Sequence, residues 1–136
     1  MTNSIVRVTD TIGNVCAIII NRSANFENVQ FLTDLSEEFQ LGVMKRGPSS
    51  PVPKHKHNVL PRSINRTSEF LIIRKGTAKI TIWSQNNVYI NTYNLIEGDC
   101  ILLLDGYHEM EFNSECQLVE VKQGPYDLKL DKSYES

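Results

Sequence analysis

Hydrophobic residues recur at every second position along this chain, in short runs separated by Gly, Pro, Asn or Ser. A period of two predicts strands, because successive side chains of a strand face opposite sides of its sheet. The runs are rich in Ile, Val, Tyr and Phe, which are residues that strands favour. The pattern predicts strands over residues 4–10, 14–21, 29–33, 39–47, 69–76, 78–84, 87–95, 100–104, 108–112 and 116–122.

The connections between these runs indicate an antiparallel arrangement. Asn86 and Asn87 separate two runs and predict a tight hairpin turn, since Asn tolerates the positive φ that such a turn requires. Only residues 31–39 have the composition of a helical turn. A strand about every ten residues is typical of a sandwich or barrel. We therefore expect an all-β, single-domain antiparallel β-barrel or jelly roll over residues 1–126, with a flexible polar tail over 127–136.

The length and net charge of the chain limit the kinds of function that we expect. A chain of 136 residues suffices for one domain with a substantial core, here expected to include Leu71, Ile73, Ile80, Ile82 and Phe112. The net charge of -2, with scattered Lys and Arg, gives no electrostatic basis for binding nucleic acid or a membrane. Residues 1–10 lack the basic start and long apolar core of a secretory signal, and no apolar run approaches about 18 residues, so we expect neither a signal nor a membrane span. We expect a cytoplasmic protein with neither a nucleic-acid nor a membrane partner.

The three cysteines predict no disulfide framework. Cys16, Cys100 and Cys116 are odd in number and lack CxxC spacing, so we interpret them as small buried apolar residues. Cys100 precedes a continuous apolar run, which indicates burial rather than a reactive thiolate. The sequence also lacks a GxSxG motif and a Gly-rich phosphate loop. Nucleophilic catalysis is therefore disfavoured.

Two of the three histidines, His55 and His57, are separated only by Lys56. On a strand, residues i and i+2 face the same side about 6.5–7 Å apart, which suits a two-histidine metal clamp. The alternative is a pair of surface histidines on a polar loop. Both interpretations stay open on this pair alone.

Two further residues share the interior faces of predicted strands. Glu69 alternates with the apolar positions of its run, and a buried carboxylate is costly unless it is paired or binds a cation. His108 alternates with Met110 and Phe112, so its ring is expected to face the protein interior. Imidazole and carboxylate groups are ligands of Zn, Fe, Mn and Ni. The sequence therefore predicts a metal site built from His55, His57, Glu69 and His108.

These residues resemble the two sequence motifs of the cupin superfamily, over residues 47–113. Gly47, His55, His57, Glu69 and Gly76 resemble the first motif, G(x)5HxH(x)3-4E(x)6G, in order, and the spacing from Glu69 to Gly76 agrees with it. The second, G(x)5PxG(x)2H(x)3N, is matched by Gly98, Gly106 and His108. The resemblance implies a small β-barrel that holds one divalent transition metal ion, Fe, Zn, Ni or Mn, on His55, His57, Glu69 and His108.

The chain departs from both motifs. Eleven residues separate His57 from Glu69, so residues 58–68 are expected to form an excursion at the barrel mouth. Leu104 stands at the proline position of the second motif, and His108 lies one position early after Gly106. Inward alternation on its strand keeps His108 in the predicted site.

Three functions suit such an ion with open coordination positions. The first is a small-molecule metalloenzyme that polarises a sugar or keto acid for isomerisation. The second is an Fe(II) dioxygenase, and the third is a non-enzymatic domain that binds or senses a small ligand. Glu69 is a possible catalytic residue, and Arg62 and Arg66 are candidates for holding an anionic substrate group. Tyr107 is a weaker acid or base candidate, because alternation turns it away from the interior.

Some predicted strands are apolar on both faces. Residues 70–74 and 101–104 contain such runs, so their outer faces require a covering layer or a second subunit. Proteins of the cupin type commonly pair through such sheets. We therefore expect a homodimer that binds a small-molecule ligand.

Overall fold

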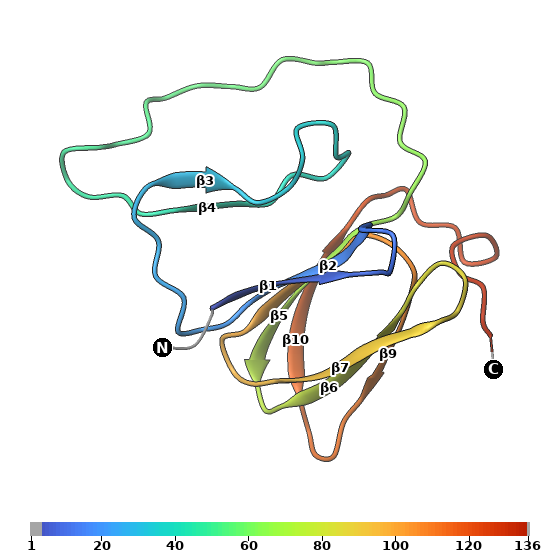
Figure 1. Ribbon diagram of the computed structural model, residues 1–136. Helices are drawn as coiled ribbons and strands as arrows, with labels where there is room; N and C mark the ends of the chain where they lie inside the picture. Colours follow the sequence, from blue (N-terminus) through green and yellow to red (C-terminus); the bar gives the residue numbers. More distant parts are fainter. Residues whose placement is uncertain (1–3, 136) are drawn as a thin grey trace. The chain divides into compact units, whose positions relative to one another are not determined.

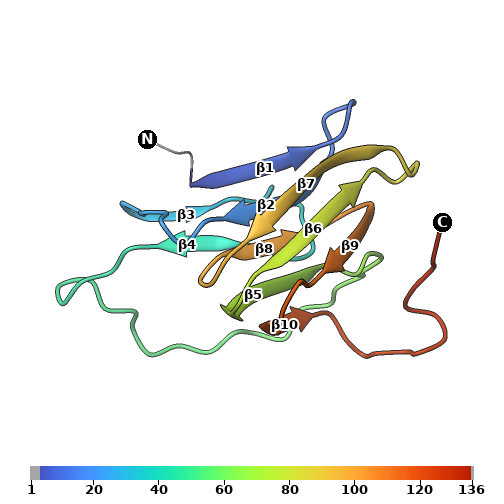
Figure 2. The ribbon, with the colours of Figure 1, turned by 90° about the horizontal axis from the view of Figure 1, so that it is seen from below.

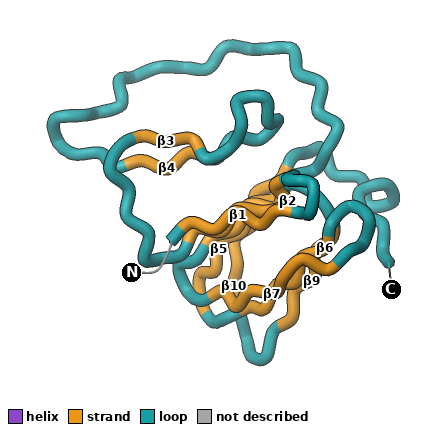
Figure 3. The backbone as a smooth tube through the Cα atoms, viewed as in Figure 1, coloured by secondary structure: helices purple, strands orange, loops and turns teal. Residues whose placement is uncertain are grey.

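The computed structural model describes residues 4–135 and is built from antiparallel β-sheets, with no helix among these residues (Figure 3). All ten predicted strands are confirmed, with boundaries that differ by a few residues. The strands are β1 (Ile5–Thr9), β2 (Val15–Ile20), β3 (Val29–Phe31), β4 (Gly42–Met44), β5 (Glu69–Lys75), β6 (Ala78–Trp83), β7 (Tyr89–Leu95), β8 (Cys100–Leu103), β9 (Tyr107–Glu111) and β10 (Gln117–Lys122).

The chain divides into two compact units, one formed by residues 1–24 with 66–136 and the other by residues 25–65. The first unit contains a five-stranded sheet in the order β1-β2-β8-β5-β10 and a three-stranded sheet in the order β7-β6-β9. Figures 1 and 2 show these two sheets as the layers of this unit. Neighbouring strands in both sheets are antiparallel.

One face of each sheet encloses the hydrophobic core of the first unit. The five-stranded sheet contributes Ala17, Ile19, Leu71, Ile73, Ile101 and Leu103, and the three-stranded sheet contributes Ile80, Ile82 and Leu95. Four of the five predicted core residues are confirmed. The prediction that Phe112 belongs to the core is wrong. Phe112 follows the last residue of β9 and is 47% exposed, because the alternation ends with the strand.

The fold class is confirmed at the level of an all-β protein with antiparallel sheets. The strand pairings of residues 4–135 form separate sheets, and no closed barrel is found among them. No helix of the described residues is long and apolar enough to span a membrane. The helical turn considered for residues 31–39 is absent, and a turn with a hydrogen bond from Glu37 N–H to Asp34 O takes its place.

The turns of the first unit depend on residues that adopt positive φ. Asn87 has φ 62° in the β6–β7 hairpin, as the Asn86-Asn87 pair predicted, and Ser84 accepts its N–H at 2.9 Å. Gly106 has φ 82° directly before β9, where a Cβ atom would lie 2.2 Å from the carbonyl oxygen of Trp83. Gly106 thus allows β9 to begin against β6, which fixes the position of His108.

The second unit contains the β3–β4 hairpin followed by a long segment without strands, residues 45–65. Within the hairpin loop, the Gln40 side chain donates hydrogen bonds to the carbonyl oxygens of Asp34 and Glu37, at 2.7 and 2.9 Å. At the far end of the segment, the Asn65 N–H donates to Glu38 at 2.7 Å. The segment therefore starts and ends at the same hairpin.

Candidate functional site

Glu69 and His108 meet at one end of the interior of the first unit. Glu69 begins β5 and precedes the core residue Leu71 on the same face, while His108 lies on β9 opposite the core residue Ile82. The two strands belong to different sheets, so the contact spans the interior. His108 Nε2 lies 3.6 Å from Glu69 Oε1, and the two side chains are 35% and 15% exposed. Both residues lie on the core-facing side of their strands, but the ring of His108, which was expected to be buried, is exposed.

Glu120 on β10 joins this pair and was not found by sequence reasoning. In the β5–β10 pairing, Glu120 lies opposite Leu71 and Lys122 lies opposite Glu69, so these residues share the face of Glu69. The carboxyl groups of Glu69 and Glu120 are hydrogen-bonded to each other. Only the register of β10 against β5 reveals Glu120 as part of the site.

The surroundings favour neutral forms of both predicted ligands. Burial, together with the hydrogen bond to Glu120 and the charge of that carboxylate, raises the pKa of Glu69 to about 7. The hydrogen bond from Glu69 lowers the pKa of Glu120. Burial and the nearby positive charge of Lys132 lower the pKa of His108. At neutral pH the imidazole of His108 is therefore uncharged, which is the form that coordinates a metal.

We expect Glu69→Gln to stabilise the metal-free protein at pH 8 and to have little effect at pH 4.5. The raised pKa of Glu69 means that the native state retains a proton that the unfolded state loses as the pH rises from about 4.5 to 7. The wild type therefore loses stability across this window, by about 1–3 kcal/mol. Gln resembles the protonated acid and avoids this loss. Urea unfolding of both proteins in chelator checks the difference.

His108 and Glu120 contact Glu69, so the pH dependence of the stability difference reports on the cluster of these three residues. Glu111→Gln is the matched control, because Glu111 is a carboxylate on β9 that lies on the surface with Lys79. A stability difference between wild type and Glu69→Gln that stays constant from pH 4.5 to 8 would contradict the close contact of the partly buried Glu69 with Glu120.

His55 and His57 lie together in the second unit, in a segment without strands. The strand on which their clamp geometry was predicted is therefore absent, yet their ring centroids are 5.1 Å apart. His55 Nδ1 lies 2.7 Å from the carbonyl oxygen of Pro53. Because a carbonyl oxygen only accepts hydrogen bonds, Nδ1 is the donor in this contact, and Nε2 takes no part in it.

The two arginine candidates lie in different surroundings. Arg62 is exposed in the second unit. Arg66 belongs to the first unit and lies 3.9 Å from Asp105, two residues before the start of β9. This ion pair is a structural contact of Arg66 beside the turn at Gly106. The role of Arg66 in binding an anion stays a prediction.

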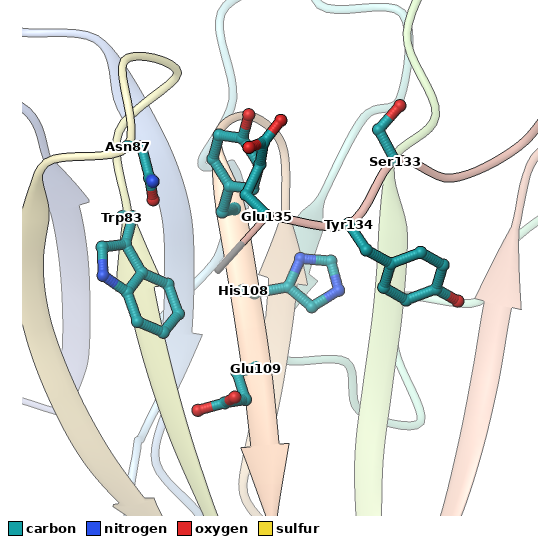
Figure 4. Close-up of a pocket in the computed structure, with 8 residues that line it drawn as sticks. Trp83, Asn87, His108, Glu109, Ser133, Tyr134 and Glu135 are labelled. Atoms are coloured by element: carbon teal, nitrogen blue, oxygen red, sulfur yellow. The ribbon is translucent and has the colours of Figure 1, made fainter.

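A pocket of about 710 Å³ lies beside His108 in the first unit. Figure 4 shows His108 between the rings of Trp83 and Tyr134, with Glu109 below and Glu135 above. Tyr107, which alternation turns away from the core, lines this pocket instead. The lining residues are Trp83, Asn87, Tyr107, His108, Glu109, Ser133, Tyr134 and Glu135.

The four predicted metal ligands are therefore found as two pairs, Glu69 with His108 and His55 with His57, one in each unit. Across residues 4–135, His, Cys, Asp and Glu side chains are nowhere grouped as a complete set of three or more metal ligands. Comparison with protein-family models, curated proteins and solved structures gives no match for this chain.

Proposed function

We propose that this chain is a small metal-binding protein of the cupin type that acts on a small molecule. Glu69 and His108 hold the ion, and the sequence resemblance supplies His55 and His57 as the other ligands. The ion is a divalent transition metal, Fe, Zn, Ni or Mn, because imidazole and carboxylate are the donors that these metals share.

The contact between Glu69 and His108 carries this proposal. Two ligands bound to one ion at about 2.0–2.2 Å lie about 3.0–3.5 Å apart in tetrahedral or octahedral coordination. The 3.6 Å between Glu69 Oε1 and His108 Nε2 is close to that separation. Glu69 also contacts a second carboxyl group, Glu120, and a cation relieves the repulsion between two such groups. The donor set therefore fits a metal ion.

Two further observations support the resemblance. His55 lies next to His57 and contacts the carbonyl oxygen of Pro53 through Nδ1, the kind of contact by which the second ring nitrogen of a metal-binding histidine is oriented. Gly76 and Gly98, which match the glycines of the two motifs, both adopt positive φ, at 84° and 93°. These positions therefore need glycine for a backbone reason, which favours a motif match over chance.

The bound ion would supply Lewis-acid polarisation of a carbonyl or hydroxyl oxygen. Sugar or keto-acid isomerisation is the function we favour, and Glu69 is the group that would exchange a proton near the substrate. An Fe(II) dioxygenase and a non-enzymatic binding or sensing domain are the alternatives. The metal identity separates the first two, since oxygen chemistry requires a redox-active ion.

We also propose a jelly-roll arrangement of the two sheets and a homodimeric assembly. The two sheets that enclose the core are the expected layers of a jelly roll. The five-stranded sheet also carries apolar side chains on its outer face, including Val119 and Val121, which are 42% and 51% exposed. We propose that this face contacts a second copy of the chain, which would cover it.

We expect the double substitution His55→Ala with His57→Ala to abolish stoichiometric metal binding and to leave the protein folded. The core lies between the two sheets of the first unit and does not include either histidine. The measurement is metal content by elemental analysis after purification without chelator or affinity metal, with circular dichroism as the test of folding. Full metal content in the double variant would contradict the four-ligand site.

A further inference from the structure

The pocket beside His108 has walls that select for uncharged, hydroxyl-rich ligands. Three of its lining residues are aromatic, and two more, Glu109 and Glu135, are carboxylates. None of the described residues that line it is Lys or Arg. Such a wall repels phosphate and carboxylate groups, while carboxylates and amides bind hydroxyl groups through hydrogen bonds.

The aromatic residues provide the surface on which a sugar ring can pack. Trp83 ends β6 and Tyr134 lies in the C-terminal segment, residues 126–135, on the other side of His108 (Figure 4). The ring of Tyr134 is 86% exposed, so its faces are open to a ligand. Aromatic faces bind the apolar C–H faces of sugar rings, and their polar edges remain hydrogen-bonding groups.

The C-terminal segment is attached just before the residues that line the pocket. Lys122 Nζ lies 3.5 Å from Asp131 Oδ2 and 4.7 Å from the centre of the Tyr126 ring. Asp127 accepts hydrogen bonds from the N–H groups of Lys129 and Leu130, at 2.9 and 3.1 Å. All four contacts precede residues 133–135, so the part of the segment that lines the pocket follows an anchored turn.

One basic residue lies between this anchor and the pocket wall. Lys132 is not among the lining residues, but its charge acts on His108, which lines the pocket, as well as on Glu69 and Glu120. The charged side chains that line the pocket itself are the carboxylates of Glu109 and Glu135.

We propose that this pocket binds a neutral sugar, and that sugar phosphates and keto acids are excluded from it. The proposal rests on the proposed function only in taking the sugar to be the molecule presented to the ion at His108. Of the two substrate classes in the proposed function, sugars and keto acids, this proposal selects uncharged sugars. Asn87 and the carboxylates of Glu109 and Glu135 bind its hydroxyl groups, and Trp83 and Tyr134 contact its ring.

Trp83 is the only tryptophan of the chain, so its fluorescence reports on this pocket directly. We expect saturable changes on titration with at least one member of a panel of neutral aldohexoses, aldopentoses and their disaccharides. Glucose 6-phosphate, mannose 6-phosphate and 2-oxoglutarate should give none. Saturation by the anionic compounds alone, or by no member of the panel, would overturn the proposal.

Matched variants place the sugar in the pocket. Glu109→Gln should weaken the Kd about tenfold, because a charge-assisted hydrogen bond to a hydroxyl becomes a neutral one. Glu111→Gln, which alters a carboxylate on the same strand outside the pocket, should leave the Kd unchanged. Equal effects of the two substitutions would show that the sugar binds elsewhere.

The titrations are run in chelator and again with added Zn²⁺ or Mn²⁺, and metal binding is measured separately by calorimetry. If the protein responds to a sugar but binds no metal, the sugar-binding pocket is supported and the proposed metal function is contradicted. If it binds metal at Glu69 and His108 but responds to no sugar, the metal site is supported and the sugar proposal is contradicted. The two proposals therefore fail independently.

Discussion

Replacement of His108 by alanine is expected to weaken metal affinity by at least about a hundredfold while leaving the protein folded. Loss of a residue that merely supports a metal ligand already costs about ten- to a hundredfold, and loss of a ligand costs more. The ring of His108 is partly exposed, so its removal leaves no large cavity in the core. Calorimetric titration of the chelator-treated variant with Zn²⁺ or Mn²⁺ measures the change.

The two histidine variants together identify the ligands. Loss of binding in both His108→Ala and the His55→Ala with His57→Ala variant is the result expected for one shared ion. Loss in the His108 variant alone would restrict the ion to the first unit, with Glu69 and Glu120 as the remaining donors. Unchanged affinity in His108→Ala would exclude the Glu69–His108 contact as a metal site.

Ile80→Ala is expected to reduce the free energy of unfolding by about 3–4 kcal/mol. Ile80 is fully buried on β6, where it pairs with Tyr93 on one side and Met110 on the other. Removal of a buried branched side chain loses its transfer free energy and leaves a cavity that the sheets fill only in part. Such a loss is a large share of the stability of a typical domain. Urea unfolding followed by Trp83 fluorescence measures it.

Val29→Ala is the control for this core substitution. Val29 is a β-branched apolar residue on β3 of the second unit, and it is 43% exposed. We expect a loss below about 1 kcal/mol, because little buried surface is removed. If the two substitutions cost the same, the core does not lie between the two sheets.

The strands were predictable because their signal is local. Period-2 alternation and turn residues depend on neighbours in the sequence, and the ten runs and the Asn86-Asn87 turn followed from them. The same alternation placed Glu69 and His108 on interior faces, since Glu69 lies in step with the buried Leu71 and His108 lies in step with Met110, which packs against the core. The prediction of Phe112 as a core residue failed because alternation carries no information beyond the end of the strand.

The role of Glu120 shows where local alternation stops being informative. In β10 the apolar residues Val119 and Val121 alternate with Glu120, so the pattern alone favours the two valines as the buried face. The pairing with β5 instead places Glu120 beside Leu71 and leaves the valines half exposed. Strand register depends on partners far away in the sequence, and one residue of register exchanges the two faces.

The sequence by itself determined the all-β class, the positions of the strands and the inward direction of Glu69 and His108. It did so because side-chain direction along a strand is a property of the local backbone. Only the tertiary structure decided that β5 and β9 face each other from different sheets and bring Glu69 within 3.6 Å of His108. It also decided that Glu120 joins them and that residues 133–135 form a wall of the adjoining pocket. Such contacts between distant residues follow from the packing of whole sheets, which no local pattern encodes.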